Sequence, residues 1–138
     1  MSFLRLSTRA LPTQLLQAQH IGLRTIATAS KKEWLCILPD KPDALELRKQ
    51  VRPTHMAGVG PLVQAGKLVA GGAMLGSHPE EGQDLSFKGS MLIYTAETVE
   101  EVRQLVEDDI YAKSGVWDME KALVVPYLSA VREPLKKE

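Results

Sequence analysis

The sequence predicts an α+β domain with the order β-α-β-β-α-β, a ferredoxin-like arrangement in which two helices cover one face of a four-stranded antiparallel sheet. Two observations lead to this prediction. Short apolar runs typical of strands alternate, in the required order, with two stretches whose apolar residues recur at helical spacing. The length of 138 residues suits a single domain. The expected strands are residues 33–38, 67–75, 90–95 and 116–127.

The first thirty residues differ in composition from the rest of the chain. Residues 1–32 carry five basic side chains and no acidic one, together with many Ser, Thr, Ala and Leu residues. A basic, hydroxyl-rich leader without acids is typical of a mitochondrial transit peptide, and it lacks the continuous apolar core of a secretory signal. We therefore expect a mitochondrial protein, with the matrix as its compartment. The alternative is that residues 1–30 are a disordered basic leader. In either case the folded domain is residues 31–138.

The first expected strand is a nearly continuous apolar run, which favours a central strand buried on both faces. It contains Cys36, the single cysteine, which we expect to be a small buried side chain. One cysteine rules out an intramolecular disulfide and makes a thiolate metal site within one chain implausible. The turn from Pro39 to Pro42 ends the strand.

The first helix is expected to start at Asp43, as an N-cap with Glu46 three residues later, and to run to about Ala65. Pro53 lacks an amide hydrogen, so it must kink this helix or restart it. A restart would put His55 near a new helix N-terminus. Gly66 follows the last apolar residue and suits the C-cap.

The remaining elements follow from similar signals. In the second strand, Gly71-Gly72 marks a bulge or a close backbone approach. Residues 76–88 form a polar loop before the third strand. Thr98 and Glu101 have the spacing of a capping box and start a helix that ends in an acidic cluster, residues 107–109.

Apolar residues occur on both faces of the first and third strands, although two helices cover only one face of such a sheet. A second copy of the chain is the simplest cover, and the sequence therefore predicts a homodimer through the open sheet face. Residues 33–138 hold 12 basic and 17 acidic side chains, which argues against nucleic-acid binding. No apolar run approaches the ~20 residues of a membrane-spanning helix, so no membrane partner is expected.

The candidate site is organised around Val51–Met56, which puts arginine, proline and histidine within four residues. His55 is the candidate base, and Asp109 is the candidate acid, with its neighbour Asp108 as an alternative. A carboxylate bonded to one ring nitrogen selects the tautomer and leaves the other nitrogen free to move a proton. The more ordinary interpretation of His55 is a satisfied, partly buried side chain, and that of the acids is solvation at a helix end.

Several motifs resemble the YciI-like (YCII-related) family over roughly residues 33–132. They are Val51–Met56, Gln64–Gly72, Gly89-Ser90, Asp108–Tyr111, Gly115-Val116 and Val125–Tyr127. The resemblance implies a dimeric α/β barrel and a His–Asp pair in a cleft, with His55 and Asp109 in those positions. One departure is Ile110, where the family usually has proline, so the turn that aims the aspartate is expected to differ.

The expected chemistry is general acid–base catalysis without a cofactor, an isomerase- or lyase-like proton transfer on a small, oxygen-rich metabolite. Arg52 and Arg48 can hold an anionic or enolate oxygen, unless they simply pair with helix acids. Ser90 and Tyr111 can orient a polar group of this small-molecule ligand. No cofactor motif is present, and one histidine among scattered carboxylates is a poor zinc site. The alternatives are a non-catalytic metabolite-binding module and a structural dimeric module.

Overall fold

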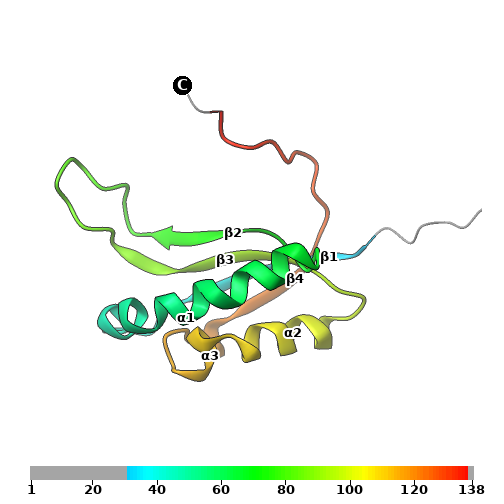
Figure 1. Ribbon diagram of the computed structural model, residues 1–138, viewed down its shortest axis with the longest axis horizontal. Coiled ribbons are helices and arrows are strands. Elements are labelled where there is room, and N and C mark those ends of the chain that lie inside the picture. Colours follow the sequence, from blue (N-terminus) through cyan, green and yellow to red (C-terminus); the bar gives the residue numbers. More distant parts are fainter. Residues whose placement is uncertain (1–30, 137–138) are drawn as a thin grey trace, which may run out of the picture.

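The computed structural model describes residues 31–136, and the predicted leader, residues 1–30, lies outside them (Figure 1). The strands pair in the order β2-β3-β1-β4, and every pair is antiparallel. This confirms the predicted α+β, ferredoxin-like fold. The elements are β1 (Glu33–Pro39), α1 (Leu45–Gln64), β2 (Leu68–Leu75), β3 (Phe87–Thr95), α2 (Val99–Asp108), α3 (Ile110–Lys113), a 3-10 helix (Met119–Lys121) and β4 (Leu123–Tyr127).

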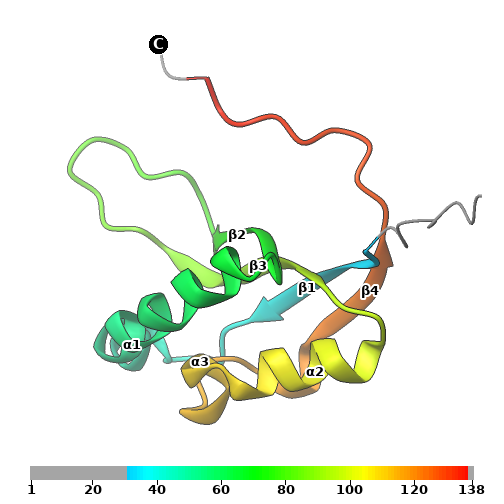
Figure 2. The same cartoon turned by 45° about the vertical axis from the view of Figure 1, so that its right-hand side comes forward.

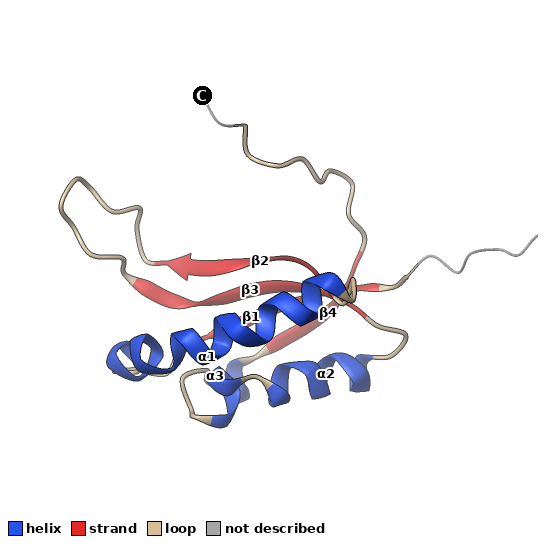
Figure 3. Ribbon diagram, in the orientation of Figure 1, coloured by secondary structure: helices blue, strands red, loops and turns tan. Residues whose placement is uncertain are grey.

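All the helices lie on one side of the sheet, with α1 over β2 and β3 and α2 nearer β1 and β4 (Figures 2 and 3). Side chains alternate between the two faces of a strand, so Cys36 and Leu38 of β1 point toward the helices and into the core. None of the helices in residues 31–136 is both long and apolar enough to cross a bilayer.

The opposite face of the sheet carries no helix in the part of the chain that the structure describes (Figure 2). We call it the open face, and the strand registers assign it a row of apolar residues. These are Leu35, Ile37, Met91, Ile93, Leu123 and Val125. Apolar residues on this side agree with the pattern in the sequence.

The first helix differs from its prediction at both of the points that concern His55. Asp43 is not the N-cap: it has a φ of 61°, and Ala44 precedes the helix without a side-chain cap. The helix also runs without a break through Pro53 and Pro61, so the restart was wrong. His55 therefore lies in the middle of a long helix, far from the positive end of its dipole. Gly66, with a φ of 66°, follows the helix end as expected.

The fourth strand is shorter than predicted, because residues 116–122 leave the sheet. Val116 and Trp117 are fully buried although they lie outside the sheet. Their apolar side chains made the segment resemble a strand in the sequence. Trp117 instead forms an isolated bridge with Asp40, and the 3-10 helix follows. The four-residue helix α3 was also absent from the prediction.

Two other local predictions hold. Thr98 caps α2, since its side chain accepts a hydrogen bond from the N–H of Glu101. A Cβ added to Gly71 would stand 2.7 Å from Cδ2 of Leu92, so Gly71 marks a close approach. The register shifts of the β2–β3 pair lie elsewhere, between Leu68 and Ala70 and between Met74 and Leu75.

Cys36 is fully buried, and burial raises the pKa of its thiol to about 11. Because the thiolate is the reactive form, we expect a maleimide to label the native protein very slowly at pH 8. The same protein unfolded in guanidinium should label rapidly, and mass spectrometry would count the adducts. Equally fast labelling of the native and unfolded protein would contradict the burial of Cys36.

Candidate active site

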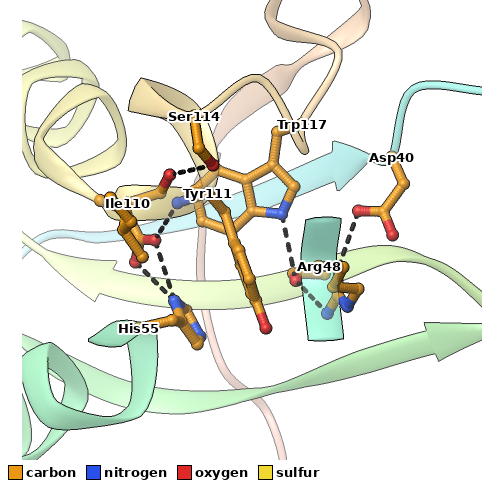
Figure 4. A network of polar contacts seen from close by, with 9 residues as sticks. Asp40, Arg48, His55, Ile110, Tyr111, Ser114 and Trp117 are labelled. Atoms are coloured by element: carbon orange, nitrogen blue, oxygen red, sulfur yellow. Dashed lines mark hydrogen bonds and ion pairs between the residues drawn. The ribbon is translucent and has the colours of Figure 1, made fainter. Parts of the chain in front are cut away.

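The structure brings together His55 of α1 and Asp109, which are 54 positions apart in the chain. Nδ1 of His55 lies 2.8 Å from Oδ2 of Asp109 and 2.9 Å from Oδ1 (Figure 4). Both side chains are only 10% exposed. A carboxylate in this position accepts a hydrogen bond from Nδ1–H of the neutral imidazole, and this tautomer leaves a lone pair on Nε2.

Asp109 is held in place by a second hydrogen bond. It is the N-cap of α3, and its Oδ1 accepts from the backbone N–H of Tyr111 at 2.8 Å. Ile110 occupies the first helical position, which is also the position that proline prefers. Isoleucine can therefore replace proline here without re-aiming the carboxylate. Asp108 is 59% exposed and lies 3.7 Å from Lys113, so Asp109 is the acid that contacts the histidine.

The ring of Tyr111 lies between two of the other predicted site residues (Figure 4). On one side it stacks on His55, with ring centroids 4.1 Å apart and planes 18° apart. On the other side the guanidinium carbon of Arg48 lies 4.6 Å from the ring centroid. Burial raises the pKa of Tyr111, so its hydroxyl remains a phenol, able to donate a hydrogen bond.

Arg48 is buried and mostly engaged by the protein itself. Its Nη1 lies 2.7 Å from Oδ1 of Asp40, and its Nη2 donates to Oγ of Ser90 at 3.1 Å. Nε1 of Trp117 donates to the same hydroxyl. The described residues offer no acceptor to Nε of Arg48. The ion pair and the hydrogen bond thus occupy Nη1 and Nη2, and the guanidinium also packs against the ring of Tyr111.

Asp40 is the residue that the sequence analysis missed. Burial raises the pKa of its carboxyl, and the guanidinium of Arg48 opposes that rise. The available signal was an acid directly after a buried strand, where a charge needs a partner. In the sequence it stands out only as part of the turn that ends β1.

A cavity of about 370 Å³ lies between α1 and the β2–β3 hairpin. Five of the six predicted site residues line it, and Asp109 stands behind His55. Arg52 makes no ion pair or side-chain hydrogen bond with any residue of the described range and is exposed, so it is the cation at the cavity that the described residues leave free. The polar lining residues are Arg48, Arg52, His55, Ser90 and Tyr111.

This arrangement suits proton transfer to or from a bound molecule. Nε2 of His55 has no hydrogen-bond partner among residues 31–136, whereas Nδ1 is taken by Asp109. A positive side chain beside an imidazole can stabilise an oxygen that becomes negative when a neighbouring proton is removed. No group of three or more His, Cys, Asp or Glu side chains suited to a metal occurs in the described range.

Comparison with known families identifies the domain. The model of the YCII-related domain matches residues 33–124, two thirds of the chain. The chain belongs to the YCII-related family. This confirms the resemblance read from the sequence motifs.

The chain is also similar to individual proteins and to a solved structure. Fusaric acid biosynthesis protein 2 of Gibberella fujikuroi is 38% identical over 98 residues, which cover 71% of this chain and 94% of that protein. Aspartate kinase FUB3 of Fusarium oxysporum is 38% identical over 96 residues, 70% of this chain but only 18% of that longer protein. The 5-chloro-2-hydroxyhydroquinone dehydrochlorinase of Burkholderia phenoliruptrix, solved with 2,5-dihydroxybenzoquinone, is 31% identical, with a TM-score of 0.60. That match covers 70% of this chain and 93% of the dehydrochlorinase.

Proposed function

We propose that this YCII-related protein is a cofactor-independent enzyme that transfers protons on a small, hydroxylated carbonyl compound. The observation that carries the proposal is the contact of 2.8 Å between His55 and Asp109 at the wall of a cavity. Nε2 of His55 serves as the base, and Asp109 orients the ring and stabilises the imidazolium that forms.

The proposed step begins when Nε2 removes a proton from a carbon beside a carbonyl group. The electron pair of the broken C–H bond moves toward the carbonyl oxygen and gives an enolate, which Arg52 stabilises. Return of the proton to another atom completes an isomerisation. Departure of a leaving group with its electron pair completes an elimination. Neither outcome needs an oxidant, a reductant or a second substrate.

Two relatives support this substrate class. The dehydrochlorinase is named for the removal of HCl from a hydroxylated ring, and it was solved with a hydroxylated quinone. Fusaric acid biosynthesis protein 2 is named for the biosynthesis of a small organic acid. A second candidate function is a module that holds such a compound without chemistry. The engagement of Arg48 by Asp40 favours that alternative, because it leaves the cavity with one free cation instead of two.

The test uses 2,5-dihydroxybenzoquinone as the probe. A ligand that binds only the folded state raises the apparent melting temperature, which thermal shift would measure. In D₂O, an active acid–base site should also accelerate the exchange of the ring C–H for deuterium. A deuteron added to the ring carbon gives the keto tautomer, and removal of the proton from the same carbon by Nε2 restores the enol. Loss of the proton NMR signal would measure the rate. Binding with exchange supports the enzyme, and binding without exchange supports the non-catalytic module. No binding of this probe or of related enolisable carbonyl compounds would remove the proposal.

We infer that the open face is covered by a second copy of the chain. Its row of aliphatic side chains is larger than the scattered apolar residues of an ordinary surface. Light scattering at micromolar concentration should give twice the mass of one chain. A monomeric mass, unchanged when Ile37 is replaced by lysine, would contradict the dimer.

We propose in addition that residues 1–30 direct the protein to mitochondria. Five basic side chains and no acid in residues 1–32 support this. A fluorescent protein fused to residues 1–32 should co-localise with mitochondria, and diffuse fluorescence in the cytosol would exclude the targeting role.

A further inference from the structure

The cavity extends well beyond the group of reactive side chains. Along α1, Val63 lies eight residues after His55, which is roughly 12 Å of helix. Along the sheet, Ala73 pairs with Ser90 at one end of the cavity, and Leu68 pairs with Tyr94 at the other. The two positions on β2 are five residues apart, which is roughly 16 Å. The cavity is therefore longer than the space around His55 requires.

The two ends of the cavity differ in chemistry. Arg48, Arg52 and His55 stand at the end near Ser90. After His55 every lining residue of α1 is apolar, and so is every lining residue of β2. The short connection between these elements brings Val63 close to Leu68, since the N–H of Lys67 donates to the carbonyl of Leu62 at 2.9 Å. The lining of this far end is Met56, Val59, Val63, Leu68, Val69 and Ala70.

The apolar end is uncovered in the structure. Met56 and Val63 are apolar side chains of α1, yet they are 47% and 54% exposed. Both line the cavity, so apolar surface at this end is available to a bound molecule. Gly71 lies between the two ends, and a Cβ there would press on Leu92. Because Gly71 has no side chain, Leu92 packs directly against the backbone of β2 at this point.

We propose that the natural substrate is a hydroxylated, enolisable ring that carries an apolar substituent of several carbons. This inference rests on the proposed function and adds to it the part of the substrate that lies outside the reacting ring. The ring oxygens lie against Arg52 and His55, and the substituent extends along Val59 and Val63. A charged or strongly polar substituent would not suit this end, because it would meet only aliphatic side chains.

The test compares two probes, 2,5-dihydroxybenzoquinone and its 3-butyl derivative. Each methylene that leaves water for an apolar surface raises affinity about fourfold, so partial burial of four carbons should raise it at least about tenfold. Isothermal titration calorimetry would measure both dissociation constants. The butyl compound should bind at least about tenfold more tightly to the wild-type protein.

A pair of variants locates the effect. Val63→Asn places an amide at the apolar end, and the half-exposed position allows the fold to persist. It should reduce the advantage of the butyl probe to about threefold or less, with little change for the bare ring. Leu85→Asn is the matched control, because Leu85 is 45% exposed and lies outside both the cavity and the sheet. The control should keep the full advantage. Circular dichroism would verify that both variants fold.

The outcomes separate this inference from the proposed function. If the bare ring binds and exchanges its hydrogen but the butyl probe binds no better, the inference is wrong and the function stands. The inference is equally wrong if Val63→Asn and Leu85→Asn behave alike. If neither probe binds, the proposed function fails, and the substrate inference falls with it.

Discussion

Replacement of Asp109 by asparagine is expected to lower turnover by about 10²–10⁴-fold while leaving the fold intact. Asparagine keeps an oxygen that can accept from the N–H of Tyr111, and it is a good N-cap, so α3 should form. Its amide group, however, donates toward Nδ1 of His55. The imidazole then carries its hydrogen on Nε2, and the base that should face the substrate loses its lone pair.

The measurement does not depend on the natural substrate. Nitrogen NMR of the labelled imidazole should show the hydrogen on Nδ1 in the wild type and on Nε2 in the variant. Deuterium exchange of the probe ring gives the rate. Asp108→Asn is the matched control, because the neighbouring carboxylate is exposed and does not contact His55. Equal loss of rate in the two variants would show that Asp109 has no special role.

Replacement of Arg48 by methionine is expected to lower the free energy of unfolding by about 3–5 kcal/mol, because it leaves the Asp40 carboxylate buried without a partner. The side chains of this pair are only 5% and 8% exposed. Methionine fills much of the same volume, so the loss reports the charge more than a void. Urea denaturation followed by circular dichroism would measure it. Lys49→Met is the matched control on the same helix: its partner Glu46 is 84% exposed, and the expected cost is about 0–1 kcal/mol.

The penalty should depend on pH. Burial raises the pKa of Asp40, and without Arg48 nothing opposes that rise. When the pKa of a carboxyl is higher in the folded than in the unfolded state, the folded protein becomes less stable as pH rises through the unfolded-state pKa. The reason is that the carboxyl then ionises in the unfolded chain but not in the folded one. The variant should therefore be closer to the wild type near about pH 4 than at about pH 7. Asp40→Asn in the same chain should recover part of the loss. A penalty independent of pH would show that the carboxyl is not the cause.

The order of elements was predictable because each segment carries a local signal that agrees with the fold. The apolar run of β1 and the cap at Thr98 are examples, and both depend only on near neighbours. The start of the fourth strand was predicted wrongly because the local signal is ambiguous there. Trp117 is buried next to Ser90, and a buried segment is apolar in sequence whether it lies in the sheet or beside it.

Only part of the candidate site could be predicted from the sequence. The contact of His55 with Asp109 was anticipated from motifs, but the choice between Asp109 and Asp108 depends on where α2 ends, and helix ends are poorly encoded in sequence. The pairing of Arg48 with Asp40 was not anticipated, since it joins two elements across a turn. As a result, one of the two arginines expected to meet a ligand is already held in an ion pair by the protein itself.

The acid and the base stand on separate helices, and the acid begins a helix of only four residues. Such a helix has little stability of its own and depends on its docking against α1 and on Tyr111. A sub-global opening of residues 109–114 would thus separate the pair while the sheet stays folded. Native-state hydrogen exchange should find these amides less protected than those of β1. Activity would then be lost on heating at a temperature below the melting point of the whole domain, and a bound ligand would raise the temperature of that loss.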